Sequence, residues 1–117
     1  MLFKLILSFV FLSNQPDPCS GQWVSVNDKT GKEKSEISLY VEGEKLYSRI
    51  DALLLPEDQG KMCEGSEKGK SIVGLVIVQD LVKERENWMD GTILDPADGK
   101  RYSCNISLNH DGNLYVR

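Results

Sequence analysis

The sequence predicts an all-β protein whose antiparallel strands follow one another in an up-and-down meander and curl into a barrel. Apolar residues recur at every second position in several short segments, which is the period of a strand and not of a helix. Turn-forming residues separate these segments at fairly regular intervals, as in small barrels. The chain has 117 residues, of which 40% are hydrophobic and 27% charged. This length and composition predict one ordinary globular domain.

The first twelve residues differ from the rest of the chain. One positive charge, Lys4, precedes an apolar run at 5–12, and polar residues and Pro16 follow at once. A membrane-spanning helix needs about 20 apolar residues, so this run predicts no transmembrane span. A short apolar run behind a positive charge is typical of a secretory signal peptide. The alternative is a buried N-terminal helix, which Pro16 would end.

We therefore expect two parts in the chain, a signal peptide with its linker at 1–20 and the mature domain at 21–117. The cleavage site is placed only loosely, between Ser13 and Ser20. An exported domain of this kind would be periplasmic or secreted. Acylation of Cys19 as a lipoprotein is an alternative, although no box of small residues precedes that cysteine.

The first half of the predicted domain contains three expected strands. The segment 21–26 alternates and ends at a polar turn that contains glycine. In 36–41, the side chains of Ile37, Leu39 and Val41 share one face. A tight hairpin then leads into 45–52, where Leu46, Ile50 and Ala52 share a face with Ser48.

The second half contains four more expected strands. The segment 71–79 is apolar on both faces, so we expect the most buried strand there, with a bulge or bend at Gly74. A short strand at 91–94 leads into a strong turn signal. The segment 101–108 alternates most clearly, and a further hairpin joins it to 113–117. The residues of 101–108 expected to point inward are Tyr102, Cys104, Ile106 and Leu108.

Seven expected strands leave the barrel incomplete, because an antiparallel up-and-down barrel closes with an even number. Either a strand near 82–89 escapes the pattern or one edge stays open, and an open edge would allow a homodimer to form.

The polar stretch 56–70 is longer than a usual loop, so it is either a functional flap or a flexible excursion. Trp88 lies among charges, and we expect its ring to fold over one end of the barrel.

The sequence offers little that would support catalysis. A net charge of −4 argues against a nucleic-acid binder that works through a basic surface. His110, the one imidazole, lies in a turn without a nucleophile or an orienting acid nearby in the sequence. No phosphate-binding glycine loop or zinc-ligand spacing is present. We therefore expect no catalytic residues, no metal site, no cofactor and no nucleic-acid partner.

Three cysteines allow one disulfide and leave one thiol over. Cys104 lies on an expected inward face, where a free thiol behaves as a small apolar group. Cys19 and Cys63 both lie in loop-like sequence, so an oxidising compartment would favour that pair.

An ordered set of segments covering nearly all of the mature chain resembles domain-of-unknown-function family 2147. The resemblance implies a small exported bacterial protein with a lipocalin-like barrel and a hydrophobic interior, and it brings no catalytic residues. The triplet Gly21-Gln22-Trp23 is also similar to the lipocalin Gly-x-Trp signature, in which the tryptophan plugs the closed end of the barrel. The segments that carry the resemblance are 21–23, 28–32, 43–50, 72–77, 88–96, 99–102 and 114–117.

The chain departs from this family pattern in two places. The loop holds one cysteine, Cys63, where relatives often have two close together, which puts a disulfide or thiol role for the loop in doubt. The chain stops at Arg117, where relatives continue through a further glycine and a tryptophan-containing strand, so we expect it to be shortened.

We expect a binding protein that holds a small hydrophobic molecule inside the barrel. Each candidate wall residue has an alternative interpretation as part of a packed core. The alternative function is a protein-interaction module of the cell envelope, with a filled core and an exposed edge strand. The candidate wall residues are Leu39, Leu46, Ile50, Val76, Tyr102, Ile106 and Leu114, and the barrel-end aromatic residues are Trp23 and Trp88.

Overall fold

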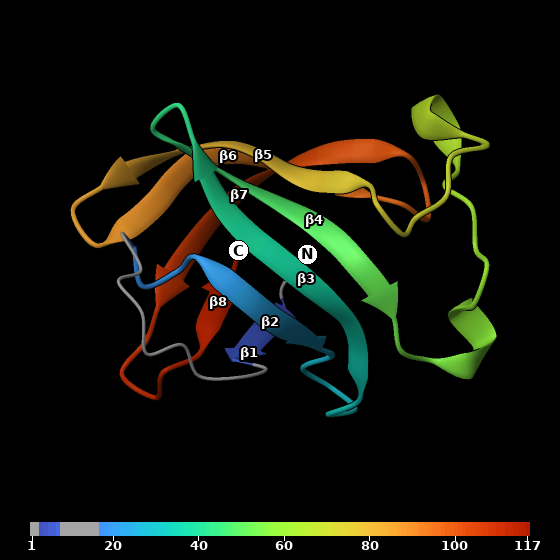
Figure 1. Cartoon of the computed structure of the whole chain (residues 1–117), viewed down its shortest axis with the longest axis horizontal. Helices are drawn as coiled ribbons and strands as arrows, with labels where there is room; N and C mark the ends of the chain where they lie inside the picture. Colours follow the sequence, from blue (N-terminus) through green and yellow to red (C-terminus); the bar gives the residue numbers. More distant parts are fainter. Residues whose placement is uncertain (1–2, 8–16) are drawn as a thin grey trace.

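Eight antiparallel strands close into a barrel in the computed structural model, which describes residues 3–7 and 17–117 (Figure 1). Each strand pairs with its neighbour in the chain, and the last pairs with the first. The predicted all-β meander and barrel are confirmed. The strands are β1 (Phe3–Leu7), β2 (Gly21–Val26), β3 (Glu33–Glu42), β4 (Lys45–Leu53), β5 (Val76–Glu84), β6 (Asn87–Asp95), β7 (Lys100–Leu108) and β8 (Leu114–Val116).

The strand that closes the barrel is β1, which comes from the run expected to be a signal peptide. Leu5 pairs with Ser25 of β2 on one side and with Leu114 of β8 on the other. The count of seven strands is therefore wrong: the strand that escapes the pattern lies at 3–7 and not near 82–89, and the alternative of an open edge is wrong among the described strands. The sequence does not predict a strand here because the apolar residues from Leu5 onward show no alternation. Much of the expected cleavage region, between Ser13 and Ser20, lies outside the described residues.

The hairpin of β5 and β6 differs most from the prediction. The strand expected at 71–79 begins only at Val76, and Val73 is 44% exposed, so the most buried strand is not found there. The strand instead runs on to Glu84 and turns directly into β6. Asp80 and Asp90 adopt positive φ angles of 65° and 62°. Such residues interrupt the two-residue alternation that sequence reading depends on.

The two ends of the barrel are built differently. We call one the closed end; it holds residues 17–20 and the turns that join β3 to β4, β5 to β6 and β7 to β8. We call the other the mouth; it holds the turns that join β2 to β3 and β6 to β7, together with the long segment 54–75. That segment contains two short 3-10 turns, η1 (Pro56–Asp58) and η2 (Gly65–Glu67), and projects to the right in Figure 1.

Candidate functional site

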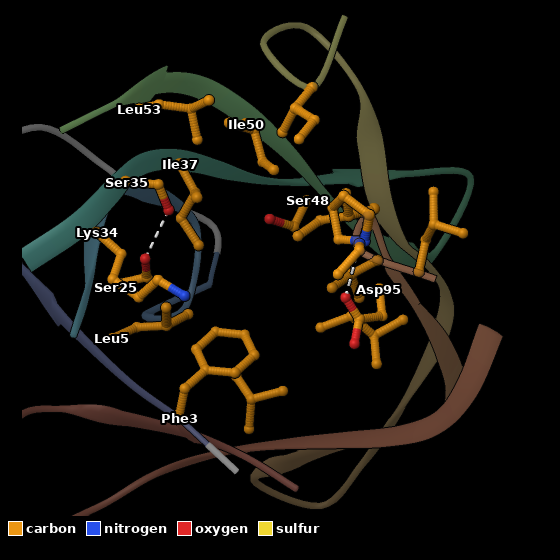
Figure 2. Close-up of a pocket in the computed structure, with 18 of the residues that line it drawn as sticks. Phe3, Leu5, Ser25, Lys34, Ser35, Ile37, Ser48, Ile50, Leu53 and Asp95 are labelled. Carbon is orange, nitrogen blue, oxygen red and sulfur yellow. Dashed lines mark hydrogen bonds between the residues drawn. The ribbon is translucent and has the colours of Figure 1, made fainter. Parts of the chain in front are cut away.

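A cavity of about 1070 Å³ opens at the mouth of the barrel (Figure 2). Most of its wall is apolar and comes from inward-facing positions of the strands. A volume of this size is at the upper end of the range for pockets that take small molecules. The apolar residues that line it include Phe3, Leu5, Ile37, Leu39, Ile50, Leu53, Ile72, Ile77, Ile93, Leu94 and Ile106.

Three of the predicted wall residues line this cavity, namely Leu39, Ile50 and Ile106. Leu46 and Leu114 are fully buried but lie nearer the closed end and do not border the cavity. They belong to what we call the closed half of the barrel, where side chains fill the interior. The buried residues of the closed half include Cys19, Trp23, Leu46, Leu81, Trp88, Cys104 and Leu114.

Two of the predicted wall residues lie outside the cavity. Val76 is half-buried at the start of β5 and does not border it. Tyr102 is 39% exposed and does not border the cavity, although it pairs with the lining residue Ile93, so its predicted place in the lumen wall is wrong. Leu108, at the other end of β7, is equally exposed, although it pairs with the buried Leu114. The Tyr102 hydroxyl donates a hydrogen bond of 2.5 Å to Asp98 in the neighbouring turn. A phenol near a strand end finds this polar partner at the rim, which keeps its ring out of the lumen.

Sequence reading missed much of the wall, and two groups of the missed residues are informative. Phe3 and Leu5 line the cavity from a run that was assigned to export. Ser25, Ser35 and Ser48 line it as polar residues at inward positions. The alternation on β4 did place Ser48 on the face of Leu46 and Ile50, so that signal was present in the sequence.

The serine hydroxyl groups of the cavity wall differ in whether they have a hydrogen-bond partner. The side-chain oxygens of Ser25 and Ser35 share a hydrogen bond of 2.5 Å, and these residues face each other across β2 and β3. The Ser48 hydroxyl is buried and has no hydrogen-bond partner among residues 3–7 and 17–117. Buried polar atoms are nearly always paired, so Ser48 requires an explanation.

Charged side chains of both signs surround the mouth. Lys61 and Asp58 form an ion pair of 2.8 Å, and this partner raises the pKa of Lys61. A rim of mixed charge does not favour ligands of one sign. The charged residues that line the cavity are Asp28, Asp58, Glu64 and Asp95 with Lys29, Lys34 and Lys61.

The segment 54–75 is tied to the mouth by backbone contacts. The Leu54 N–H donates to the Lys34 carbonyl at 2.8 Å, and the Glu64 N–H donates to the Pro96 carbonyl at 3.0 Å. At the second of these contacts Gly65 packs against the β6–β7 turn, where an added Cβ would lie 2.5 Å from the Asp98 carbonyl oxygen. The segment expected to be either a flap or a flexible excursion therefore has defined contacts with the rim.

A buried carboxylate organises the closed end. Asp17 accepts hydrogen bonds from the Cys19 N–H at 2.8 Å and from the Trp88 indole at 3.3 Å. Lys83 pairs with the same carboxylate at 2.6 Å and lies 5.2 Å from the centre of the Trp88 ring. The Trp23 indole donates to the Cys19 carbonyl at 3.0 Å. Both predicted barrel-end tryptophans thus lie at this end, held by the chain that precedes β2.

The charge state of Asp17 follows from these contacts. Burial acts to raise its pKa, but the hydrogen bonds from Lys83, Cys19 and Trp88 outweigh burial and hold the pKa below its ordinary value. The ionised form is therefore the one that the folded closed end stabilises.

The three cysteine thiols are free and buried in separate places. Cys19 lies at the closed end and Cys63 in the segment 54–75 at the mouth, so the expected pairing of these two is wrong. Burial raises the pKa of Cys19 to about 12, with a further contribution from Asp17, and burial raises that of Cys104 to about 11. These two thiols are therefore poor nucleophiles at neutral pH.

The described part of the chain lacks two other features. Residues 3–7 and 17–117 contain no group of three or more histidine, cysteine, aspartate or glutamate residues placed to hold a metal ion. Across the same residues, no helix has the length and apolar character needed to cross a membrane.

Comparison with known proteins gives the family. The model of family DUF2147, described as an uncharacterized protein conserved in bacteria, matches residues 21–117. The chain belongs to this family. The resemblance seen in the sequence is thereby confirmed for this DUF2147 protein, and the match covers β2 to β8. No curated protein matches it in sequence.

A solved structure has a similar fold. It is protein HP1028 from the human pathogen Helicobacter pylori, which is described as belonging to the lipocalin family. The two share 20% sequence identity with a TM-score of 0.63, over 81% of this DUF2147 chain and 67% of the other. At that identity the likeness shows the fold alone, and the barrel is lipocalin-like.

Proposed function

We propose that this DUF2147 protein is an exported, non-catalytic binding protein that carries a small hydrophobic molecule in the mouth of its barrel. The observation that supports the proposal is the apolar cavity of about 1070 Å³, which opens to solvent between three mouth segments. An eight-stranded barrel is wide enough to hold one small ligand. Transfer of apolar surface from water into such a lumen is worth about 25 cal/mol per Å².

Variants in the lumen wall test the proposal directly. Ile50 points into the cavity, whereas its neighbour Arg49 is on the other face of β4 with a half-exposed side chain. Ile50→Trp should project a large ring into the lumen and weaken binding at least about tenfold, which corresponds to about 1.4 kcal/mol. Arg49→Trp, the matched control, adds the same ring outside the barrel and should bind as the wild type does.

Ligand binding should not be measured by the protein's own tryptophan fluorescence, because Trp23 and Trp88 both lie in the closed half and do not border the cavity. An environment-sensitive apolar dye reports occupancy instead, with linear alkanoic acids as competitors and native mass spectrometry to count bound molecules. Binding that is unchanged in a folded Ile50→Trp variant, or no uptake of any of these molecules by the wild type, would refute the carrier function.

Export is supported by the charge, apolar run and prolines at the start of the chain. The same run supplies β1, so cleavage after it would remove the strand that lies between β2 and β8. The exported form would then be a seven-stranded barrel with two free edges. The N-terminal residue of the protein recovered from the cell envelope, determined by mass spectrometry, distinguishes a cleaved chain from one that keeps β1.

Removal of β1 by cleavage would favour one alternative function, a cell-envelope interaction module that pairs through an exposed edge strand. Because β2 and β8 are both antiparallel to β1, they are parallel to each other, and one strand fits between them. A strand from a second copy would satisfy both edges and form a homodimer. Sedimentation of the recovered protein tests this, since a cleaved chain that remains a monomer and crosslinks to no envelope protein argues against it.

A further inference from the structure

Ser48 is the one lining residue of β4 whose side chain is polar, and it lies between two apolar inward positions, Leu46 and Ile50. It is 1% exposed, and its hydroxyl lacks a hydrogen-bond partner within the described residues. In Figure 2 its oxygen is directed away from its strand toward the space between the lining side chains. A buried donor and acceptor left unpaired lowers the stability of the fold.

The fold itself does not account for this hydroxyl. Leu39, directly opposite Ser48 on β3, is apolar and fully buried. The other wall serines, Ser25 and Ser35, satisfy each other. An alanine at position 48 would pack in the same place without an unpaired group, so the hydroxyl is better explained by a partner that enters the cavity.

The register of the sheet gives the distance between the two polar levels of the wall. Ser35 and Leu39 are four residues apart on β3, and Leu39 pairs with Ser48. At about 3.3 Å per residue, Ser48 lies roughly 13 Å farther along the strands from the mouth than the Ser25–Ser35 pair does. Ile37 and Ile50 occupy the level between them.

We propose that the ligand is an elongated amphiphile with an apolar middle and a hydrogen-bonding group at each end, whose inner group pairs with Ser48. This inference rests on the proposed function and specifies the chemistry of the bound molecule. The inner group is a hydroxyl or carbonyl, because an uncharged group can be desolvated at this depth at modest cost. The outer group stays at the mouth, near the Ser25–Ser35 pair and the charged rim. Hydroxylated long-chain carboxylic acids have this layout.

Two probes that differ only at the far end test the inference. ω-Hydroxydodecanoic acid and dodecanoic acid would each displace the apolar dye from the full chain, from Ser48→Ala and from a control, Ser103→Ala, whose side chain is exposed on β7. The wild type and the control should bind the hydroxylated acid about fivefold to tenfold more tightly, the effect of one added hydrogen bond. Ser48→Ala should lose this preference and bind dodecanoic acid at least as well as the wild type does.

Each other outcome has a definite meaning. If neither acid displaces the dye and native mass spectrometry finds neither bound, the proposed function itself fails. If both acids bind equally to the wild type, the carrier function stands and the inference about Ser48 is overturned. Because these two outcomes need only the wild type, a poorly folded variant would not obscure them.

A crystal structure with bound ω-hydroxydodecanoic acid should place its terminal oxygen within hydrogen-bond distance of Ser48 Oγ. A water molecule there, with no ligand oxygen in reach, overturns the inference.

Discussion

The closed half of this barrel and the remainder next to the mouth, which we call the mouth half, are built from the same strands with the same alternation. The closed half is nevertheless filled with side chains, whereas the mouth half contains the cavity. In the closed half, Leu46, Leu81 and Trp88 are fully buried among other side chains. In the mouth half, Ile37 and Ile50 are almost as buried but border a cavity. An inward position therefore does not tell whether a residue belongs to a core or to a ligand wall. What lies beside the side chain decides, since Ile37 borders the cavity although it pairs with Trp23 of the closed half.

The tryptophans account for much of this difference. Trp23 and Trp88 are the two largest side chains of the interior, and both lie at the closed end. Serines occupy the corresponding inward positions toward the mouth on β2 and β3. Side-chain volume is thus concentrated at one end, which leaves space at the other.

The largest expected effect compares two leucines, one from each half. Leu46→Ala should cost about 3 kcal/mol of unfolding free energy, because it opens a void in a filled interior. Leu39→Ala, the matched change in the mouth half, should cost at least about 1 kcal/mol less, since Leu39 already borders space and has fewer contacts to lose. Urea unfolding of both variants measures the difference. Equal losses would contradict the division into a filled half and a hollow half.

The next effect concerns Asp17, the buried carboxylate at the closed end. Asp17→Asn removes the charge that pairs with Lys83 and should cost about 2 kcal/mol at neutral pH. The pKa of Asp17 is lowered in the folded state, so its stabilising contribution is present above its ordinary pKa of 3.8 and is lost as the pH falls through the folded value. The difference in unfolding free energy between the wild type and Asp17→Asn should therefore shrink below about pH 4. Urea unfolding at a series of pH values measures it. A gap independent of pH would exclude this electrostatic role.

The smallest effect concerns the mouth segment. Gly65 and Gly60 both have positive φ angles, of 72° and 74°, but only at Gly65 would a Cβ contact neighbouring backbone. Gly65→Ala should destabilise the contact with the β6–β7 turn by about 1 kcal/mol more than Gly60→Ala does. Hydrogen exchange of the Glu64 amide, which donates to the Pro96 carbonyl, reports the contact. Equal exchange rates in the two variants would show that the close approach at Gly65 does not hold this segment.

Prediction of the fold from the sequence was accurate where alternation is regular. The strands around Ile37, Leu46 and Ile106 were expected, and the structure contains them with those residues buried. The β5–β6 hairpin was misjudged because Asp80 and Asp90 break the period of two. The first strand was missed because its apolar run has the composition of a signal peptide, and composition alone cannot separate these two roles.

Of the candidate site, the sequence supplied only part. Leu39, Ile50 and Ile106 were named correctly as facing inward, and they line the cavity. Tyr102 does not line the cavity, because its hydroxyl donates to Asp98 at the rim, a contact that depends on how the β6–β7 turn folds. Phe3 could be recognised as part of the wall, and the Ser48 hydroxyl as unpaired, only once the strands were placed around a common space.

The order of residues alone was enough to establish the β class, the family and the faces of the regular strands, because side-chain alternation is a local property of an extended chain. Closure of the barrel, the filled and hollow halves and the isolation of the Ser48 hydroxyl were decided by the tertiary structure. These features depend on which residues from distant strands meet at one level, and how much volume they bring there. No local pattern carries that information.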